Sequence, residues 1–235
     1  MGWFDFLTGS PLKRHARRVT DRDSQPEDRE ASANWLADEG GEEALLALCG
    51  RFALQLEHGM KDRKEKDLVF ELLCGKGMVG AAVARRYAQS NLHFAYAVKV
   101  VDRVEGSDAA TALLLDMLAR ESVDNELKPE KKHHLLIALA ERKDARILAN
   151  AAAFLSDFNE GVRNAAVEAV AAQEGDDARG PLGAALANPK EESTRIRGRL
   201  AEIFMARRWA IPDDPWLSAH LPQGFRLDGE RLIRA

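Results

Sequence analysis

The chain has 235 residues, of which 46% are hydrophobic and 31% are charged. That hydrophobic share is ordinary for a chain that buries a core, so the composition excludes wholesale disorder. The formal net charge of -4 makes a nucleic-acid partner unexpected, because nucleic-acid-binding domains usually carry a basic excess that neutralises phosphates. No stretch approaches the roughly 20 apolar residues that span a bilayer, and the N-terminus does not have the order of a secretory signal. The sequence therefore predicts a cytoplasmic protein without a transmembrane segment.

The first residues form an aromatic segment that contains Trp3, Phe4 and Phe6, and a basic cluster at 13–18 follows it. Three roles remain open for the aromatic segment. It covers the protein's own first helices, it docks on a partner protein, or it contacts a membrane surface at its periphery together with the basic cluster, through residues 2–18.

The chain is expected to divide into three parts. Residues 1–40 form an N-terminal extension with a capping helix over about 26–37, residues 41–210 form an array of helices, and residues 211–235 form a C-terminal cap. Both ends are expected to cover apolar faces that the array would otherwise expose.

From about residue 42 onward, apolar residues recur at helical spacing in segments of about a dozen residues. The polar breaks between these segments are too short for crossovers, so successive helices are expected to be antiparallel neighbours. The pattern predicts about five helix pairs: 41–56 with 64–74, 78–89 with 92–104, 108–120 with 129–142, and one pair each within 145–173 and 177–208.

An internal repeat is clearest in the last two pairs. Val162 and Arg163 in the first of them correspond to Ile196 and Arg197 in the second. The offset is about 34 residues, which lies in the range of paired-helix repeats.

The unit over 145–173 resembles a HEAT repeat. Repeats of that family end the first helix with a small-Leu-x-Asp turn and open the second with Val-Arg-x-x-Ala-x-x-Ala, and the matching residues here are Leu155, Asp157, Val162, Arg163, Ala166 and Ala169. The resemblance, which is to bacterial HEAT-repeat-domain proteins, implies an all-α fold, an α-α superhelix or solenoid. It also implies that Asp157 and Arg163 belong to a ladder of hydrogen bonds between neighbouring repeats. The next unit departs from the pattern, because Asn188 and Pro189 stand in its turn, and the charge of the ladder is expected to be lost there.

The C-terminal cap begins where Pro212 and Pro215 are expected to end the helical pattern. The following FRLDGERLI then predicts a small β-hairpin about Asp228-Gly229, because Asp-Gly is a strong turn pair.

Motifs of catalysis are not found in the sequence, so neither an enzyme nor a cofactor is expected. Residues 75–80, GKGMVG, lack the preceding strand and the Lys-Ser/Thr pair of a phosphate loop, and they predict a helix end and a turn instead. His133 and His134 are adjacent, and neighbouring positions on a helix point about 100° apart, so no metal site is expected from them.

The second helix of each pair lines the concave surface in an architecture of this kind. The positions on these helices that the apolar ridge does not need are the candidates for binding a partner: Lys132, Arg163, Asn164, Arg197 and Arg199. Lys132, Arg163 and Arg197, one repeat apart, would form a basic stripe suited to an acidic peptide or a phosphate backbone. The alternative is that Arg163 and Arg197 are used in the ladder between repeats.

The leading hypothesis for function is a non-enzymatic scaffold or adaptor that binds protein partners on the concave face. A first alternative is a nucleic-acid-binding protein such as the bacterial alkylpurine DNA glycosylases, which are HEAT-like and of similar length. Against it, Trp35, Trp209 and Trp216 stand near the ends of the array, and the net charge is negative. A second alternative is a lyase or chaperone-like helper that handles a chromophore.

Overall fold

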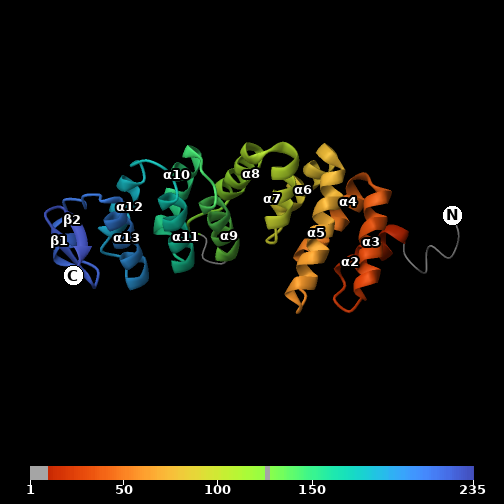
Figure 1. Cartoon of the computed structure of the whole chain (residues 1–235), viewed down its shortest axis with the longest axis horizontal. Helices are drawn as coiled ribbons and strands as arrows, with labels where there is room; N and C mark the ends of the chain where they lie inside the picture. The colour runs from red at the N-terminus through yellow and green to blue at the C-terminus, as the bar shows by residue number, and fades with distance from the viewer. Residues whose placement is uncertain (1–9, 125–127) are drawn as a thin grey trace. The chain divides into compact units, whose positions relative to one another are not determined.

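The computed structural model describes residues 10–124 and 128–235. In these ranges the chain forms 13 α-helices and one small antiparallel sheet of two strands (Figure 1). Two compact units divide the chain, Met1–Leu113 and Leu114–Ala235, and the boundary between them falls within α8 (Ser107–Ala119). We refer to them as the first and the second unit.

The helices of the first unit lie in two rows. Its elements are α2 (Pro11–Thr20), α3 (Pro26–Glu39), α4 (Gly41–Cys49), the 3-10 helix η1 (Gly50–Ala53), α5 (Gly59–Gly75), α6 (Gly77–Ser90) and α7 (Ala95–Glu105). Helix α4 packs against both α2 and α6, and α5 packs against both α3 and α7. Leu36, Leu45, Leu73 and Val101 are among the apolar side chains that are buried in this unit.

Helix α2 was not predicted from the sequence. Ser10 caps it by accepting a hydrogen bond from the backbone N–H of Lys13 at 3.3 Å, and Pro11 occupies the first turn, where a missing N–H costs nothing. Arg17 and Arg18 lie in the last turn, where cations favour the helix dipole. Ser10-Pro11 is therefore a sequence signal for a helix start, just before the basic cluster at 13–18.

Helix α5 begins earlier than the predicted residue 64. It starts at Gly59, so most of the segment that was assigned to a polar turn is the first part of this helix. The polar composition is misleading because Asp62 and Lys66 are buried and form an ion pair with each other, at 2.6 Å.

The predicted turn within residues 75–80 is confirmed. Helix α5 ends at Gly75 and α6 begins at Gly77, whose φ of 55° lies in the left-handed region. Gly80 allows the two helices to approach closely, because a Cβ atom there would lie 2.0 Å from the carbonyl oxygen of Leu73.

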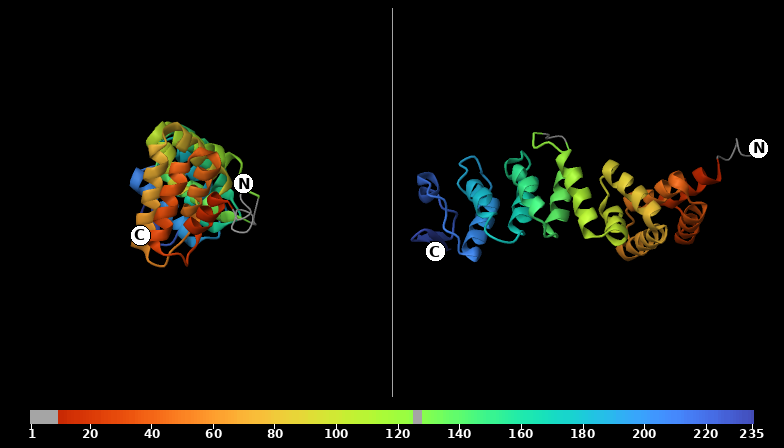
Figure 2. Two further views of the ribbon diagram at one scale, coloured as in Figure 1. Left: turned by 90° about the vertical axis from the view of Figure 1, so that its right-hand side faces the viewer. Right: turned by 90° about the horizontal axis from the view of Figure 1, so that it is seen from above.

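The second unit contains the two pairs that carry the sequence repeat. Its elements are α9 (Pro129–Ala140), α10 (Ala145–Ala152), the 3-10 helix η2 (Ala153–Ser156), α11 (Glu160–Ala171), α12 (Arg179–Leu186), α13 (Thr194–Arg207), α14 (Pro215–Ala219), β1 (Phe225–Asp228) and β2 (Arg231–Arg234). Helix α11 packs against both α9 and α13, α10 packs on α11, and α12 packs on α13 (Figure 2).

The C-terminal hairpin is present as predicted. Strand β1 pairs with β2 so that Phe225 faces Arg234 and Asp228 faces Arg231. The loop residues are Gly229 and Glu230, so the turn lies one residue later than expected, and the φ of 60° at Gly229 is one that glycine adopts readily.

The hairpin packs on α13. The backbone N–H of Ile211 donates to the carbonyl of Glu230 at 2.8 Å, Leu232 is buried, and Arg234 forms an ion pair with Glu202 of α13 at 2.9 Å. Pro215 was expected to end the helical pattern, but it opens the short helix α14, which Asp214 caps through the N–H of Leu217.

Candidate functional site

A row of charged side chains runs through the second unit from α9 to the turn before α13. Lys132 on α9 donates from Nζ to Oδ2 of Asp157 at 2.5 Å and to the carbonyl of Ser122 at 3.1 Å. Asp157 also accepts from the backbone N–H of Asn159 at 2.9 Å, which fixes the turn that leads into α11. The two side chains of this ion pair are 1% and 0% exposed, so the pair is fully buried.

The same arrangement recurs one repeat later. Arg163 on α11 donates from Nε and Nη2 to the two carboxylate oxygens of Glu191, at 2.7 Å and 3.0 Å. Glu191 in turn accepts from the N–H of Ser193 at 2.9 Å, and Ser193 caps α13 as Asn159 caps α11. The bidentate contact raises the pKa of Arg163 above its usual value. We call Lys132, Asp157, Arg163 and Glu191 the charge ladder.

Glu191 corrects the expectation that the charge of the ladder is lost in the last repeat. It occupies the place in the turn that Asp157 has one repeat earlier, and Asn188 holds the turn by accepting from the N–H of Lys190. The sequence pattern does not indicate Glu191, because the preceding repeat has the shorter acid Asp157 in this turn and because Asn188-Pro189 stand where the equivalent position is expected.

Arg197 ends the row at the C-terminal side. Its Nη2 donates to the carbonyl of His220, and its guanidinium lies 4.7 Å from the ring centre of Trp216, which stacks on the His220 ring. Lys132 and Arg163 each pair with a carboxylate, whereas Arg197 donates to a backbone carbonyl at the end of α14.

The structure brings the predicted partner-binding residues together in the second unit, but it does not present them as an open basic stripe. Lys132 is buried in the core, where it pairs with Asp157. The prediction that Lys132 belongs to an exposed basic stripe is therefore corrected. Arg199 donates to both carboxylate oxygens of Glu168 on α11, at 2.6 Å and 2.8 Å. Asn164 is half-buried on the same helix as Glu168. Trp3, Phe4 and Phe6, the predicted docking segment, lie outside the described residues.

A second cluster of buried charges, which the sequence reading missed, lies in the first unit. Its members are Arg29 on α3, Arg51 on η1, and Asp62, Glu65 and Lys66 on α5; we call them the ion network. Arg29 and Arg51 both pair with carboxylates of α5, so these ion pairs hold α3, η1 and α5 together.

Glu65 is the centre of the ion network. It accepts two hydrogen bonds from Arg29, at 2.9 Å and 2.8 Å, and one from Arg51, at 2.8 Å. Arg51, which is 1% exposed, also reaches Asp62 at 2.9 Å and the carbonyl of Leu54 at 3.1 Å. Burial by itself would raise the pKa of both carboxyl groups, but the hydrogen bonds to their charged partners outweigh it. The pKa values of Asp62 and Glu65 therefore lie below their usual range.

The signal for the ion network was present in the spacing. Asp62 and Lys66 share a helical stripe with Val69 and Leu73, which are both buried, so the apolar stripe of α5 continues into a buried charged pair. A sequence reading takes charged residues for the solvent side of a helix, and that rule fails where the partner charge comes from another element.

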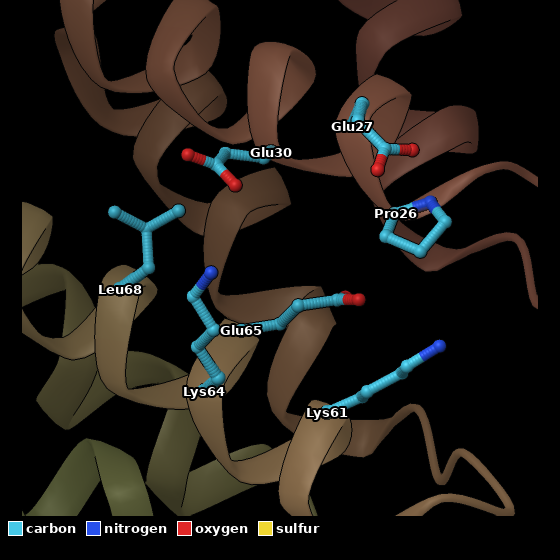
Figure 3. Close-up of a pocket in the computed structure, with 7 residues that line it drawn as sticks. All are labelled: Pro26, Glu27, Glu30, Lys61, Lys64, Glu65 and Leu68. Carbon is cyan, nitrogen blue, oxygen red and sulfur yellow. The ribbon is translucent and has the colours of Figure 1, made fainter.

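A cavity of about 270 Å³ lies beside the ion network, between α3 and α5 (Figure 3). Its lining residues are Pro26, Glu27, Glu30, Lys61, Lys64, Glu65 and Leu68. Glu27 and Glu30 come from α3, Lys61 and Lys64 come from α5, and Glu65 joins the cavity to the ion network.

Within residues 10–124 and 128–235, no group of three His, Cys, Asp or Glu side chains is placed to hold a metal ion. Over the same ranges, no helix has the length and apolar character needed to cross a membrane.

No protein-family model matches the chain, and neither a curated protein nor a solved structure is significantly similar to it.

Breaking the buried pair of the charge ladder is expected to destabilise the second unit strongly. Lys132→Met should lower the free energy of unfolding by about 3–5 kcal/mol, because it leaves Asp157 charged and uncompensated in the core. Adding Asp157→Asn removes that charge while keeping an acceptor for the N–H of Asn159, so the double variant should recover part of the loss. Urea unfolding followed by circular dichroism measures both.

The control for this cycle is Arg120→Met, which removes an exposed ion pair with Asp116 in the same unit and should cost less than about 1 kcal/mol. A Lys132→Met loss no larger than that of the control would show that the buried pair does not stabilise the unit.

The ion network predicts a loss of stability in acid. The ordinary pKa values are 4.5 for glutamate and 3.8 for aspartate, and those of Glu65 and Asp62 are lower in the folded chain. The unfolded chain then binds more protons than the folded chain as the pH falls from about 4.5, so the free energy of unfolding should decrease until both folded-state values are passed.

Denaturant unfolding at a series of pH values between 7 and 3, with Glu65→Gln beside wild type, tests this acid dependence. The variant should be less stable at neutral pH and should change less between neutral and acidic pH, whereas Glu71→Gln, an exposed position of α5, should follow wild type. Parallel curves for Glu65→Gln and wild type would exclude Glu65 as a source of the acid dependence.

Proposed function

We propose that the chain is a HEAT-like α-solenoid that acts as a non-enzymatic scaffold and binds a protein partner. The observation that carries the proposal is the charge ladder, because two successive helix pairs repeat it with the same roles at equivalent positions. An acid in the turn accepts from the next backbone N–H, a polar residue caps the second helix, and a base from the preceding second helix pairs with the acid. Repetition of one supersecondary unit with nearest-neighbour contacts is what defines a solenoid.

The packing of the second unit supports the same proposal. Helices α9, α11 and α13 follow one another in one row, and α10 and α12 pack on that row. The buried face of α11 is made of small and branched residues, among them Val162, Ala166 and Val170, which lets neighbouring helices approach closely without large side chains.

The surface that we propose for the partner is the solvent side of the α9, α11 and α13 row. It presents Ile137, which is 45% exposed, His134, Asn164, and the ion pair of Glu168 with Arg199. Because Lys132 and Arg163 are engaged in the ladder, the partner is recognised by these remaining polar and apolar groups rather than by a continuous basic stripe.

Small-angle X-ray scattering tests the architecture. A compact chain of 235 residues has a radius of gyration of about 17–18 Å, and a solenoid of this length should exceed that value clearly. A monomeric sample with the compact value would contradict the solenoid.

Site-directed photo-crosslinking tests the scaffold function independently of the architecture. A photoreactive phenylalanine analogue at His134, Ile137 or Asn164 should give a discrete protein adduct in cells that make this protein. The same analogue at Ala149 on α10 or Ala184 on α12, both exposed, provides the matched controls and should give none. Equal adducts from both rows, or none from the first, would contradict a partner surface on α9, α11 and α13.

A further inference from the structure

We propose that the cavity between α3 and α5 is a binding site for a small zwitterion, a free amino acid whose ammonium and carboxylate groups are joined by a short aliphatic chain. The proposal does not depend on the scaffold function. It rests on the opposite charges of the two cavity walls and on the ion network, which occupies the Glu65 carboxylate and so leaves Lys61 unpaired with it.

The α3 wall is acidic. Glu27 and Glu30 are three residues apart, so they lie on one face of the helix and both line the cavity. No basic residue lies three or four positions from either glutamate. Those positions hold the two glutamates themselves and Asp23, Ser24, Pro26, Ala31, Ala33 and Asn34. The wall therefore carries two carboxylates that form no ion pair within the described part of α3.

The α5 wall is basic at its rim. Lys61 and Lys64 are also three residues apart and both line the cavity, and Figure 3 shows the Lys64 ammonium group in the space between the two helices. A lysine four residues before a glutamate on a helix lies close enough to pair with it, so Glu65 is within reach of Lys61. Glu65 instead uses its two carboxylate oxygens for Arg29 and Arg51, so Lys61 keeps its charge available.

The two walls face each other without direct ion pairs. Among the described residues, no carboxylate lies within ion-pair distance of Lys61 or Lys64, and no base lies within that distance of Glu27 or Glu30. The floor between them is held in place by the bidentate Arg29–Glu65 contact, in which Arg29 is 4% exposed.

The ligand class follows from charge and size. An ammonium group is favoured at Glu27 and Glu30, and a carboxylate group is favoured at Lys61 and Lys64, while the Pro26 ring and the Leu68 side chain offer apolar contact between them. A volume of about 270 Å³ lies just below the range of about 300–1,000 Å³ for drug-sized ligands, so the ligand is a small molecule of amino-acid size.

Three probes of equal chain length separate the charge requirements: 6-aminohexanoate, hexanoate and hexylammonium. Titration of each into the full-length protein, followed by amide chemical shifts, should give saturable shifts on α3 and α5 with 6-aminohexanoate. Each singly charged probe should bind about tenfold more weakly or worse, because it loses one charge-assisted contact. Equal affinity for all three probes, or an absence of saturable shifts at millimolar 6-aminohexanoate, would overturn the proposal.

Two substitutions assign the walls. Lys64→Gln should reduce the preference for 6-aminohexanoate over hexylammonium, because only Lys61 remains on that wall, and Glu30→Gln should reduce the preference over hexanoate, because only Glu27 remains on the other. Both positions are outside the ion network, so the fold should be retained, and Arg17→Gln on α2, which is exposed, should bind as wild type does. If each variant lost affinity for all probes equally, charge recognition by the walls would be refuted.

A stability cycle without ligand excludes the simplest competing explanation. If Lys64 and Glu30 neutralised each other directly, Lys64→Gln and Glu30→Gln would be coupled in the free energy of unfolding. We expect additive effects, and a clear coupling in the absence of ligand would overturn the proposal.

Discussion

A charged side chain withdrawn from water between helices costs several kcal/mol unless an opposite charge and hydrogen bonds meet it there. This constraint governs both units of the chain. In the second unit Lys132 is buried and meets Asp157, and in the first unit Arg51 is buried and meets Asp62 and Glu65. In each case the partner comes from a different helix or turn, so the pairing fixes which elements can be neighbours. A rearrangement that separated either of these buried charges from its partner would leave an uncompensated charge away from water, which costs about 3–5 kcal/mol.

The two clusters meet this constraint in different ways. The charge ladder is linear: each base reaches forward to an acid in the next turn, and that acid holds the backbone from which the next second helix starts. The ion network is branched and holds three basic groups against two carboxylates. The extra positive charge of Arg29 is directed at the carbonyl groups of Asp21, Arg22 and Ser24, just beyond the end of α2, where a helix dipole is negative. Arg29 thus links the end of α2 to the middle of α5.

The features that depend on local periodicity could be predicted from the sequence. Most helices, the Gly75–Gly77 turn and the C-terminal hairpin follow from apolar spacing and turn chemistry. Val162 and Ile196, which the repeat offset aligns, each donate their backbone N–H to the residue that caps their helix. A side chain whose environment is set by a distant partner could not be predicted in this way. Lysine usually lies at the protein surface, and Lys132 can be buried because Asp157, 25 residues away in the sequence, pairs with it. Glu65, the floor of the cavity, is paired with Arg29 over 36 residues, a relation that no local pattern reports.

The same long-range pairing connects stability with the chemistry of the cavity. On a helix, Glu65 is within reach of an ion pair with Lys61, and such a pair would remove one of the two positive charges of the cavity rim. Because Arg29 and Arg51 occupy the Glu65 carboxylate, the pairing that holds α3 and α5 together also leaves Lys61 without an ion pair to Glu65. The glutamates of α3 are in the corresponding position, since Arg29 lies on their helix but points to Glu65. The polarity of the cavity is therefore a consequence of how the buried charges are paired. A change that separates Glu65 from Arg29 and Arg51 would let Lys61 pair with Glu65. Such a change would weaken both the contact between α3 and α5 and the positive charge of the cavity wall.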